Sequence, residues 1–199
     1  LKILLPPSVY PGVVGVLSVA DGMGGHQGGA EASKIAINSF AKSVTSPVTT
    51  RSTKEIIKNA FRSANNSIFL ESKVPELSGM GTTLTSAIIT SNGVTIGHVG
   101  DSRAYLLRDS KLHQLTNDHT WIADQINKGK LSGKQAQSHP KRNMLTRAVG
   151  IMNEIEIDIS SFSMQNLDTF LICSVGLNGQ INNLEIENIL NQKQLEIIV

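Results

Sequence analysis

Two carboxylates in this sequence share one local setting, and both have the surroundings of a metal ligand. Asp21 ends an apolar run and precedes Gly22, whereas Asp101 follows another apolar run and Gly100. A carboxylate at the end of a rigid strand is held in place, and a neighbouring glycine lets backbone oxygens and water approach closely. Carboxylates, a backbone carbonyl and water are the ligands that Mg²⁺ and Mn²⁺ prefer, so this pattern favours a hard-cation site.

Other interpretations of the same residues have to be weighed. An Asp-Gly pair at a strand end is often only a turn, and the glycine-dense segment 22–29 could instead cradle a phosphate. That segment has neither the Gly-Lys-Ser/Thr ending of a P-loop nor the dinucleotide-binding fingerprint. The single Cys173 and the five scattered histidines show no zinc spacing. We expect His26 in a surface loop and His98 in the core, and no serine lies in a G-x-S-x-G elbow.

The composition is that of one soluble globular domain spanning residues 1–199. The chain has a mass of 21.4 kDa, with 40% hydrophobic and 17% charged residues. Its net charge is only +2, without a dense Lys/Arg run, and it has five Phe, two Tyr and one Trp. A nucleic-acid-binding protein usually has a basic stripe or stacking aromatic side chains, so that class is not favoured. No apolar stretch approaches the roughly 20 residues of a membrane-spanning helix.

The cysteine usage and the N-terminus bear on location and assembly. Cys173 lies inside an apolar run, which predicts a buried thiol in a reducing compartment. The first residues lack a charged segment followed by a small-residue cleavage site, so a signal peptide is not expected. We therefore expect a cytoplasmic protein, with export as an effector left open. No heptad run predicts a dimer, and a monomer is expected.

Strand-like and helix-like patterns surround the two carboxylates. Ser52 with Glu55, and Asn182 with Glu185, have the spacing of a capping box at the start of a helix. Short strands joined by tight turns predict antiparallel meanders and an α+β domain. The expected strands are 13–20, 83–90, 94–99, 104–108, 111–115, 155–159, 169–174 and 195–199, with a turn at Asn92-Gly93 and another at Asp109-Ser110. The expected helices are 30–41, one after Ser52, 121–128 ending at Gly129, and one from Asn182 to about Asn191.

Five blocks of the sequence, in order, resemble the motifs of the metal-dependent protein Ser/Thr phosphatases (the PPM, or type 2C, family). They resemble the bacterial branch of that family in particular. The blocks are Val19-Ala20-Asp21-Gly22-Met23-Gly24-Gly25-His26, Gly79-Met80-Gly81-Thr82-Thr83, Val99-Gly100-Asp101-Ser102-Arg103-Ala104-Tyr105, Leu115-Thr116-Asn117-Asp118-His119 and Leu145-Thr146-Arg147-Ala148-Val149-Gly150.

The resemblance implies a fold and a mechanism. It implies a four-layer α-β-β-α sandwich of two antiparallel sheets flanked by helices. In the family, two Mg²⁺ or Mn²⁺ ions share a bridging Asp and activate a water that attacks the phosphorus of phosphoserine or phosphothreonine. Carried over by position, Asp21 is the bridging ligand, through which the metal-held water would act. Gly22 supplies a carbonyl, and Asp101 helps to hold a third ion.

Some matching positions are assigned no catalytic role. Met23 stands where eukaryotic members have a candidate general-acid histidine, so that role is left unassigned. His119 and Arg147 match family blocks, and we expect them to be structural.

The sequence also departs from the family pattern at three places. Ser174-Val175-Gly176-Leu177 stands where the family has S-D-G-L, and a valine side chain has no lone pair with which to bind a metal. No G-x-D-N block precedes Leu195–Val199. The family's phosphate-binding Arg and acidic N-[EQ]-D motif would lie upstream of a strand that Lys2–Leu5 continues. We therefore expect a degenerate or truncated member with a weakened Mg²⁺ or Mn²⁺ site.

Two functions from different classes remain open on these residues. The first is a phosphatase with impaired activity. The second is a pseudophosphatase that binds a phosphorylated Ser/Thr protein or its kinase without hydrolysis. A nucleotide-binding protein using the glycine-rich segment is disfavoured, because no lysine stands there to pair with phosphate.

Overall fold

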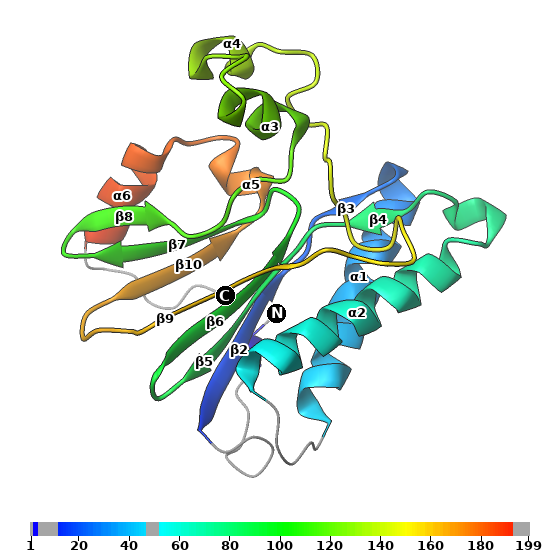
Figure 1. The fold of residues 1–199 in the computed structure, drawn as a ribbon, viewed down its shortest axis with the longest axis horizontal. Helices are drawn as coiled ribbons and strands as arrows, with labels where there is room; N and C mark the ends of the chain where they lie inside the picture. Colours follow the sequence, from blue (N-terminus) through cyan, green and yellow to red (C-terminus); the bar gives the residue numbers. More distant parts are fainter. Residues whose placement is uncertain (1, 4–11, 47–51, 193–199) are drawn as a thin grey trace.

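The computed structural model describes residues 2–3, 12–46 and 52–192, and it arranges them in four layers. Figure 1 shows two long helices against one sheet, a second sheet beyond the first, and a shorter helix on the outer side of the second sheet. The α+β class and the α-β-β-α order expected from the sequence are both found. Within the described ranges, no helix combines the length and the apolarity needed to span a bilayer.

The larger sheet is antiparallel throughout, with the order β1-β2-β5-β6-β9. The turn between β5 and β6 differs from the expected one, because Thr90 pairs with Gly93 and the loop therefore consists of Ser91 and Asn92. Of the two expected turn residues, only Gly93 has a positive φ, at 150°. The strands are β1 (Lys2–Ile3), β2 (Val13–Val19), β5 (Leu84–Thr90), β6 (Gly93–Val99) and β9 (Asp158–Phe162).

Strand β9 begins later than the pattern predicts. The alternating residues 155–159 suggested a strand there, but Ile155 and Ile157 precede β9 and pack against the helix-facing core. Apolar alternation marks which side chains are buried, and an irregular segment that crosses a core edge can have the same alternation.

The smaller sheet has the order β10-β7-β8. Asp109 and Ser110 form the turn between β7 and β8, with φ values of 50° and 61°, which is the left-handed geometry of a tight hairpin. The strands are β7 (Arg103–Arg108), β8 (Lys111–Gln114) and β10 (Thr169–Cys173). The expected final strand, Leu195–Val199, lies outside the described residues.

Two long helices cover the outer face of the larger sheet: α1 (Gly25–Thr45) and α2 (Thr53–Glu71). The capping box of Ser52 and Glu55 is confirmed at the start of α2. Helix α1 begins five residues earlier than expected, inside the segment interpreted as a glycine-rich turn. Gly24 and Gly25 make that turn, with φ values of 106° and 81°. Nearby are β3 (Gly22–Met23), which pairs with β4 (Gly81–Thr82), and the 3₁₀ turn η1 (Pro75–Leu77).

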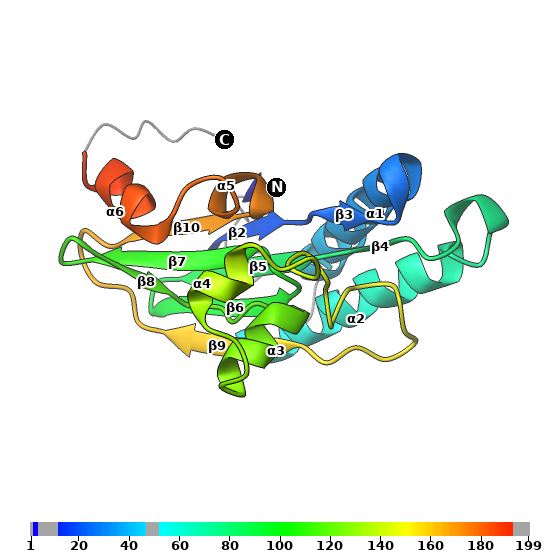
Figure 2. The ribbon, with the colours of Figure 1, turned by 90° about the horizontal axis from the view of Figure 1, so that it is seen from above.

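The remaining helices are short and lie toward one end of the sheets. Figure 2 shows α3 and α4 projecting over the sheet ends on the viewer's side, and α5 and α6 lying along the smaller sheet. Gly129 ends α3 as expected, with φ 67°, and the capping box of Asn182 and Glu185 begins α6. The helices are α3 (Trp121–Asn127), α4 (Gly133–Gln137), α5 (Val175–Asn178) and α6 (Asn183–Asn191).

Each interface between layers has its own apolar cluster. Leu84 and Ile88 of β5 face the long helices, whereas Ala87, on the opposite face of the same strand, faces the second sheet. This alternation is what a strand buried on both faces requires. Behind the second sheet, Tyr105 and Cys173 pack with α6, and Cys173 is a buried free thiol as predicted.

Gly97 lets α2 approach β6 closely, and its replacement should destabilise the fold. A Cβ at this position would overlap Ile57 and would lie 2.6 Å from Cε2 of Phe61. Because overpacking in a dense core costs about 1–3 kcal/mol, we expect Gly97→Ala to lower the free energy of unfolding by that amount. Urea unfolding followed by circular dichroism measures it.

The same substitution at Gly133 is a matched control. No heavy atom lies within 4 Å of a Cβ built at Gly133, so Gly133→Ala should change stability by no more than about 0.5 kcal/mol. Equal effects of the two substitutions would contradict the assigned packing of α2 on β6.

Candidate active site

Asp21 lies directly after β2 and is fixed through its backbone. Its N–H donates to Oγ1 of Thr83 at 3.0 Å, and its carbonyl accepts from the backbone N–H of Thr83 at 2.9 Å. Both contacts leave the side chain unused. The Asp21 carboxylate, half-buried at the end of the sheet, is therefore held in place and available as a ligand.

The backbone of Gly22 lies so close to the backbone of Gly29 that no residue with a side chain would fit there. A Cβ on Gly22 would overlap the carbonyl of Gly29 in the first turns of α1. A Cβ built on Gly28 would lie 3.3 Å from the Cβ of Met80, and one on Gly24 would lie 2.9 Å from the Cα of Met80. The glycines of this segment thus let α1 pack on the loops beside Asp21, which accounts for them without a bound phosphate.

Asp101 occupies the loop between β6 and β7, and both neighbours are anchored. Gly100 has φ 110°; its N–H donates to Nδ1 of His119 at 3.1 Å, and its carbonyl accepts from the His119 N–H at 2.8 Å. On the other side, the hydroxyls of Ser102 and Thr83 share a hydrogen bond of 2.8 Å. Thr83 therefore connects the loop of Asp101 with that of Asp21.

The electrostatics around Asp101 favour a cation. Burial raises the pKa of this carboxyl to about 6, and the charge of Asp118 and, more weakly, that of Asp21 act in the same direction. A carboxylate whose ionised form is disfavoured by burial and by like charges is stabilised when a positive ion lies beside it.

One hollow of about 330 Å³ brings the predicted residues together. Asp21, Gly22 and Asp101 all line it, and so does Val175, from the start of α5. These residues come from three separate segments of the chain. The structure thus gathers the positions that the family resemblance marked, while their role as metal ligands stays a prediction.

Val175 leaves one wall of this hollow without a donor. Its side chain is 40% exposed and consists of hydrocarbon only. Within 12–46 and 52–192, no group of three or more His, Cys, Asp or Glu side chains is placed to hold a metal ion. The carboxylates of Asp21 and Asp101 with the carbonyl of Gly22 are oxygen donors of the type that Mg²⁺ and Mn²⁺ accept, so the set fits such an ion chemically but has few charges.

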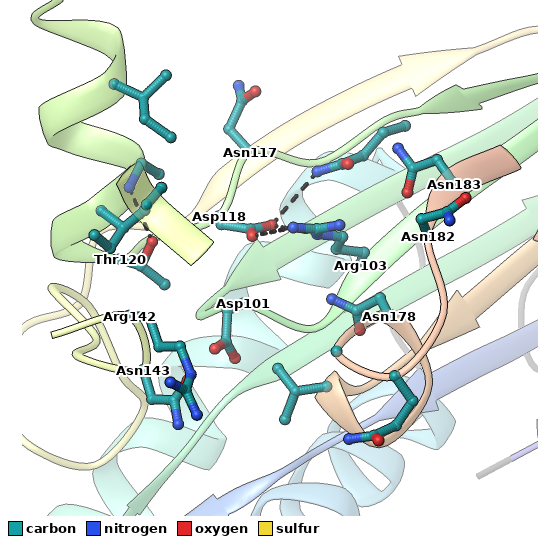
Figure 3. A pocket seen from close by; sticks show the side chains of 18 of the residues that line it. Asp101, Arg103, Asn117, Asp118, Thr120, Arg142, Asn143, Asn178, Asn182 and Asn183 are labelled. Atoms are coloured by element: carbon teal, nitrogen blue, oxygen red, sulfur yellow. Dashed lines mark hydrogen bonds and ion pairs between the residues drawn. The ribbon is translucent and has the colours of Figure 1, made fainter. Parts of the chain in front are cut away.

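Sequence reasoning missed Arg142 and Asn143, which line the same hollow. They follow α4, and Figure 3 shows both near Asp101. The Arg142 guanidinium has no hydrogen bond or ion pair among the described residues, and a guanidinium can bind two phosphate oxygens side by side. In the sequence, the only hint of Arg142 was the Lys141-Arg142 pair, which lies between two of the blocks that resemble the phosphatase family. That this pair lies in a loop near Asp101 is visible only in the structure.

His119 and Arg147 do not line the hollow and instead support it. Nε2 of His119 lies 3.2 Å from one carboxylate oxygen of Asp158, and Arg147 donates to the other at 2.7 Å. Because Nδ1 of His119 accepts from Gly100, its proton is on Nε2, which points at Asp158. This chain of contacts connects β9 to the loop of Asp101.

His98 is a satisfied core histidine, as expected. It is 1% exposed, and its ring nitrogens lie 2.9 Å from Oγ1 of Thr85 and 3.0 Å from the carbonyl of Asn117. Burial lowers its pKa from 6.5 to about 4, and the neighbouring His119 adds to this effect.

Comparison with known proteins gives consistent matches. The sequence profile described as "Protein phosphatase 2C" matches residues 8–194. The serine/threonine phosphatase stp of Listeria welshimeri is 38% identical over 184 residues, covering 90% of this chain and 73% of that protein. The serine/threonine protein phosphatase PstP of Mycobacterium tuberculosis is 36% identical over 189 residues, 94% of this chain and 36% of that protein.

Solved structures agree with these sequence matches. The S. agalactiae serine/threonine phosphatase superposes with a TM-score of 0.85 at 29% identity, covering 94% of this chain and 78% of that one. The catalytic domain of PstP in complex with two manganese ions superposes with a TM-score of 0.79 at 32% identity, covering 88% and 74%.

The low pKa of His98 predicts a pH-dependent stability. Between about pH 6.5 and pH 4 the unfolded chain protonates this histidine while the folded chain keeps it neutral, so the contribution of His98 to the free energy of unfolding should fall as the pH falls. A pKa that is 6.5 in the unfolded chain and about 4 in the folded chain corresponds to about 3 kcal/mol for His98. The raised pKa of Asp101 makes an opposite contribution over part of the same range, so the effect of His98 is the difference in slope between the unmodified chain and a His98 variant. Urea unfolding from pH 7 to pH 4 measures the slope.

His98→Gln should remove this part of the pH dependence, although it lowers stability at every pH. His113→Gln on the exposed strand β8 is the matched control and should keep the slope. A slope that His98→Gln leaves unchanged would contradict the assignment.

Proposed function

The chain belongs to the protein phosphatase 2C family, and from that premise we propose that it hydrolyses phosphoserine and phosphothreonine in proteins at a Mg²⁺ or Mn²⁺ site weakened by Val175. Its relatives are Ser/Thr protein phosphatases, and a relative's catalytic domain is described with two manganese ions. The observation that carries the proposal is the hollow in which Asp21, Gly22 and Asp101 meet Val175.

In this proposal, different residues of the chain bind the metal ions, bind the substrate phosphate and position the loops. Asp21 and the Gly22 carbonyl would hold a metal ion, and Asp101 would hold a further one. Such an ion, when bound, supplies a water of lowered pKa and neutralises phosphate charge. Arg142 would take oxygens of the substrate phosphate, since its guanidinium is unpaired among the described residues and lines the same hollow. Thr83 and His119 would keep the two carboxylate loops in register.

A pseudophosphatase is the second candidate, and Val175 is the observation that favours it. With one carboxylate fewer on the wall, the site has less negative charge to hold a divalent cation, which already gives up its water reluctantly. Such a protein would bind a phosphorylated protein or its kinase through the same hollow. A cytoplasmic location and a monomeric state also stay predictions from the sequence.

Asp21→Asn tests the metal role directly. We expect the unmodified chain to bind Mn²⁺ and to hydrolyse p-nitrophenyl phosphate slowly, and the variant to lose both. The fold should persist, because Thr83 binds only the backbone of Asp21. Calorimetric Mn²⁺ titration and absorbance at the nitrophenolate band measure the two losses.

Asp109→Asn in the β7–β8 turn is the matched control, since asparagine tolerates its positive φ. Unchanged Mn²⁺ binding in Asp21→Asn would overturn the ligand assignment. Mn²⁺ binding without any turnover in the unmodified chain would favour the pseudophosphatase.

Val175→Asp should strengthen the site. The new carboxylate would stand on the wall of the hollow, so we expect about tenfold or tighter Mn²⁺ binding, equivalent to about 1.4 kcal/mol, and faster hydrolysis. Leu177→Asp is the matched control, because it adds the same charge to α5 at a residue that does not line the hollow. If Val175→Asp and Leu177→Asp behave alike, Val175 does not occupy the metal site.

A further inference from the structure

A second and larger hollow, of about 1010 Å³, continues from the candidate active site. Asp101, Arg142 and Val175 line both hollows, so the two share a wall. One side of the larger hollow comes from α3, α4 and the loop after them, and the other side from α5 and the start of α6 (Figure 3). Its size exceeds what a phosphorylated side chain needs, and neither Asp21 nor Gly22 lines it.

Three asparagines on the α5–α6 side have their amides oriented by the protein itself. Oδ1 of Asn182 accepts from the N–H of Glu185 at 3.0 Å, as the cap of α6. Oδ1 of Asn183 accepts from the hydroxyl of Tyr105 at 3.0 Å.

Asn178 completes this set. Its Oδ1 accepts a longer contact of 3.8 Å from the thiol of Cys173. In all three residues the oxygen is used inside the protein, and the NH₂ group has no partner among the described residues. Each NH₂ group is therefore a directed donor at the wall of the hollow.

The opposite side includes apolar side chains of α3, and that helix is held in place. Ile122 and Ile126 line the hollow there, beside the polar Asn127. Thr120 caps α3 through a 3.1 Å bond to the Ala123 N–H, and the Trp121 N–H donates to the carbonyl of Met144 at 2.8 Å.

Two of the charged side chains that line the hollow compensate each other. Asp118 forms a bidentate ion pair with Arg103, at 2.6 and 2.8 Å. A charged ligand would gain little from this pair.

Amide donors that face apolar side chains complement an extended polypeptide. The carbonyl oxygens of its main chain would accept hydrogen bonds from the amides, and its side chains would pack against Ile122 and Ile126. An extended chain presents such carbonyls at regular spacing, whereas in a helix most of them are already bonded. We propose that the larger hollow binds the extended main chain that flanks the phosphorylated residue of a substrate protein, through the NH₂ groups of Asn178, Asn182 and Asn183. This inference rests on the proposed function and adds a substrate class to it: phosphorylated residues in extended, unfolded segments.

Binding of non-hydrolysable probes tests the inference separately from catalysis. The probes are a fluorescent nonapeptide of alanine and glycine around a phosphonate analogue of phosphoserine, and that phosphonate amino acid alone as a competitor, both with Mn²⁺. Because the flanking residues have almost no side chains, any gain in affinity comes from the main chain. We expect the nonapeptide to bind the unmodified chain at least about tenfold tighter than the single amino acid, from hydrogen bonds each contributing a fewfold.

Asn178→Asp with Asn183→Asp should remove that gain, because aspartate keeps the Oδ1 acceptor and replaces the donor with a repelling oxygen. Asn59→Asp with Asn66→Asp on α2 adds the same charge away from the hollow and should keep the gain. Asn182→Ser is a second variant that keeps a helix cap and loses the NH₂ group, and it should weaken the nonapeptide about threefold or more.

Two results would overturn the inference: a nonapeptide that binds no tighter than the single amino acid, or a gain in affinity that survives in both asparagine variants. If the unphosphorylated nonapeptide binds as tightly as the phosphonate nonapeptide, the inference is also overturned, because the hollow would then bind peptides independently of the phosphate. Failure of the unmodified chain to hydrolyse p-nitrophenyl phosphate would count against the catalytic proposal only, since the probes measure binding without turnover.

Discussion

The hydrogen bonds of Thr83 are the constraint on which the candidate site depends. This residue binds both backbone groups of Asp21 and the hydroxyl of Ser102, beside Asp101, so one buried side chain sets the relation between two loops far apart in the sequence. Thr85, two residues along β5, binds the carbonyl of Ser102 and the ring of His98. Such a fully satisfied buried network is rigid, and its rigidity is what keeps two carboxylates close despite their repulsion.

Close backbone packing is the second requirement, and glycine provides it. Gly22 against Gly29, and Gly100 against Thr83, bring α1 and the loops together at distances where a Cβ could not fit. The four layers meet at this end of the molecule, so the hollow forms where the sheets end. The segment containing α3 and α4 covers one side of it and brings Arg142 to the hollow.

The site differs from the family pattern in charge more than in shape. Val175 occupies its place at the start of α5, Ser174 caps that helix, and the wall remains intact. In the function proposed above, Val175 lowers the metal affinity, whereas the peptide-binding role is proposed for other residues, those of the second hollow. The proposal therefore treats metal affinity and substrate binding as separable properties.

The sequence by itself determined most of the longer strands and helices, both capping boxes, the buried Cys173 and the placement of Asp21 and Asp101 after two buried strands, but not the short helices α4 and α5. These follow from local chemistry, such as periodicity, cap spacing and motif order. The sequence did not predict the early start of α1 or the late start of β9. The glycines at the start of α1 suggested a turn, and the apolar alternation before β9 suggested a strand, but tertiary packing overrides both local signals. Only the tertiary structure decided that Arg142 lines the same hollow as Asp21 and Asp101, and that Asn178, Asn182 and Asn183 line one larger hollow. Those facts depend on hydrogen bonds between elements distant in the chain, which no local pattern encodes.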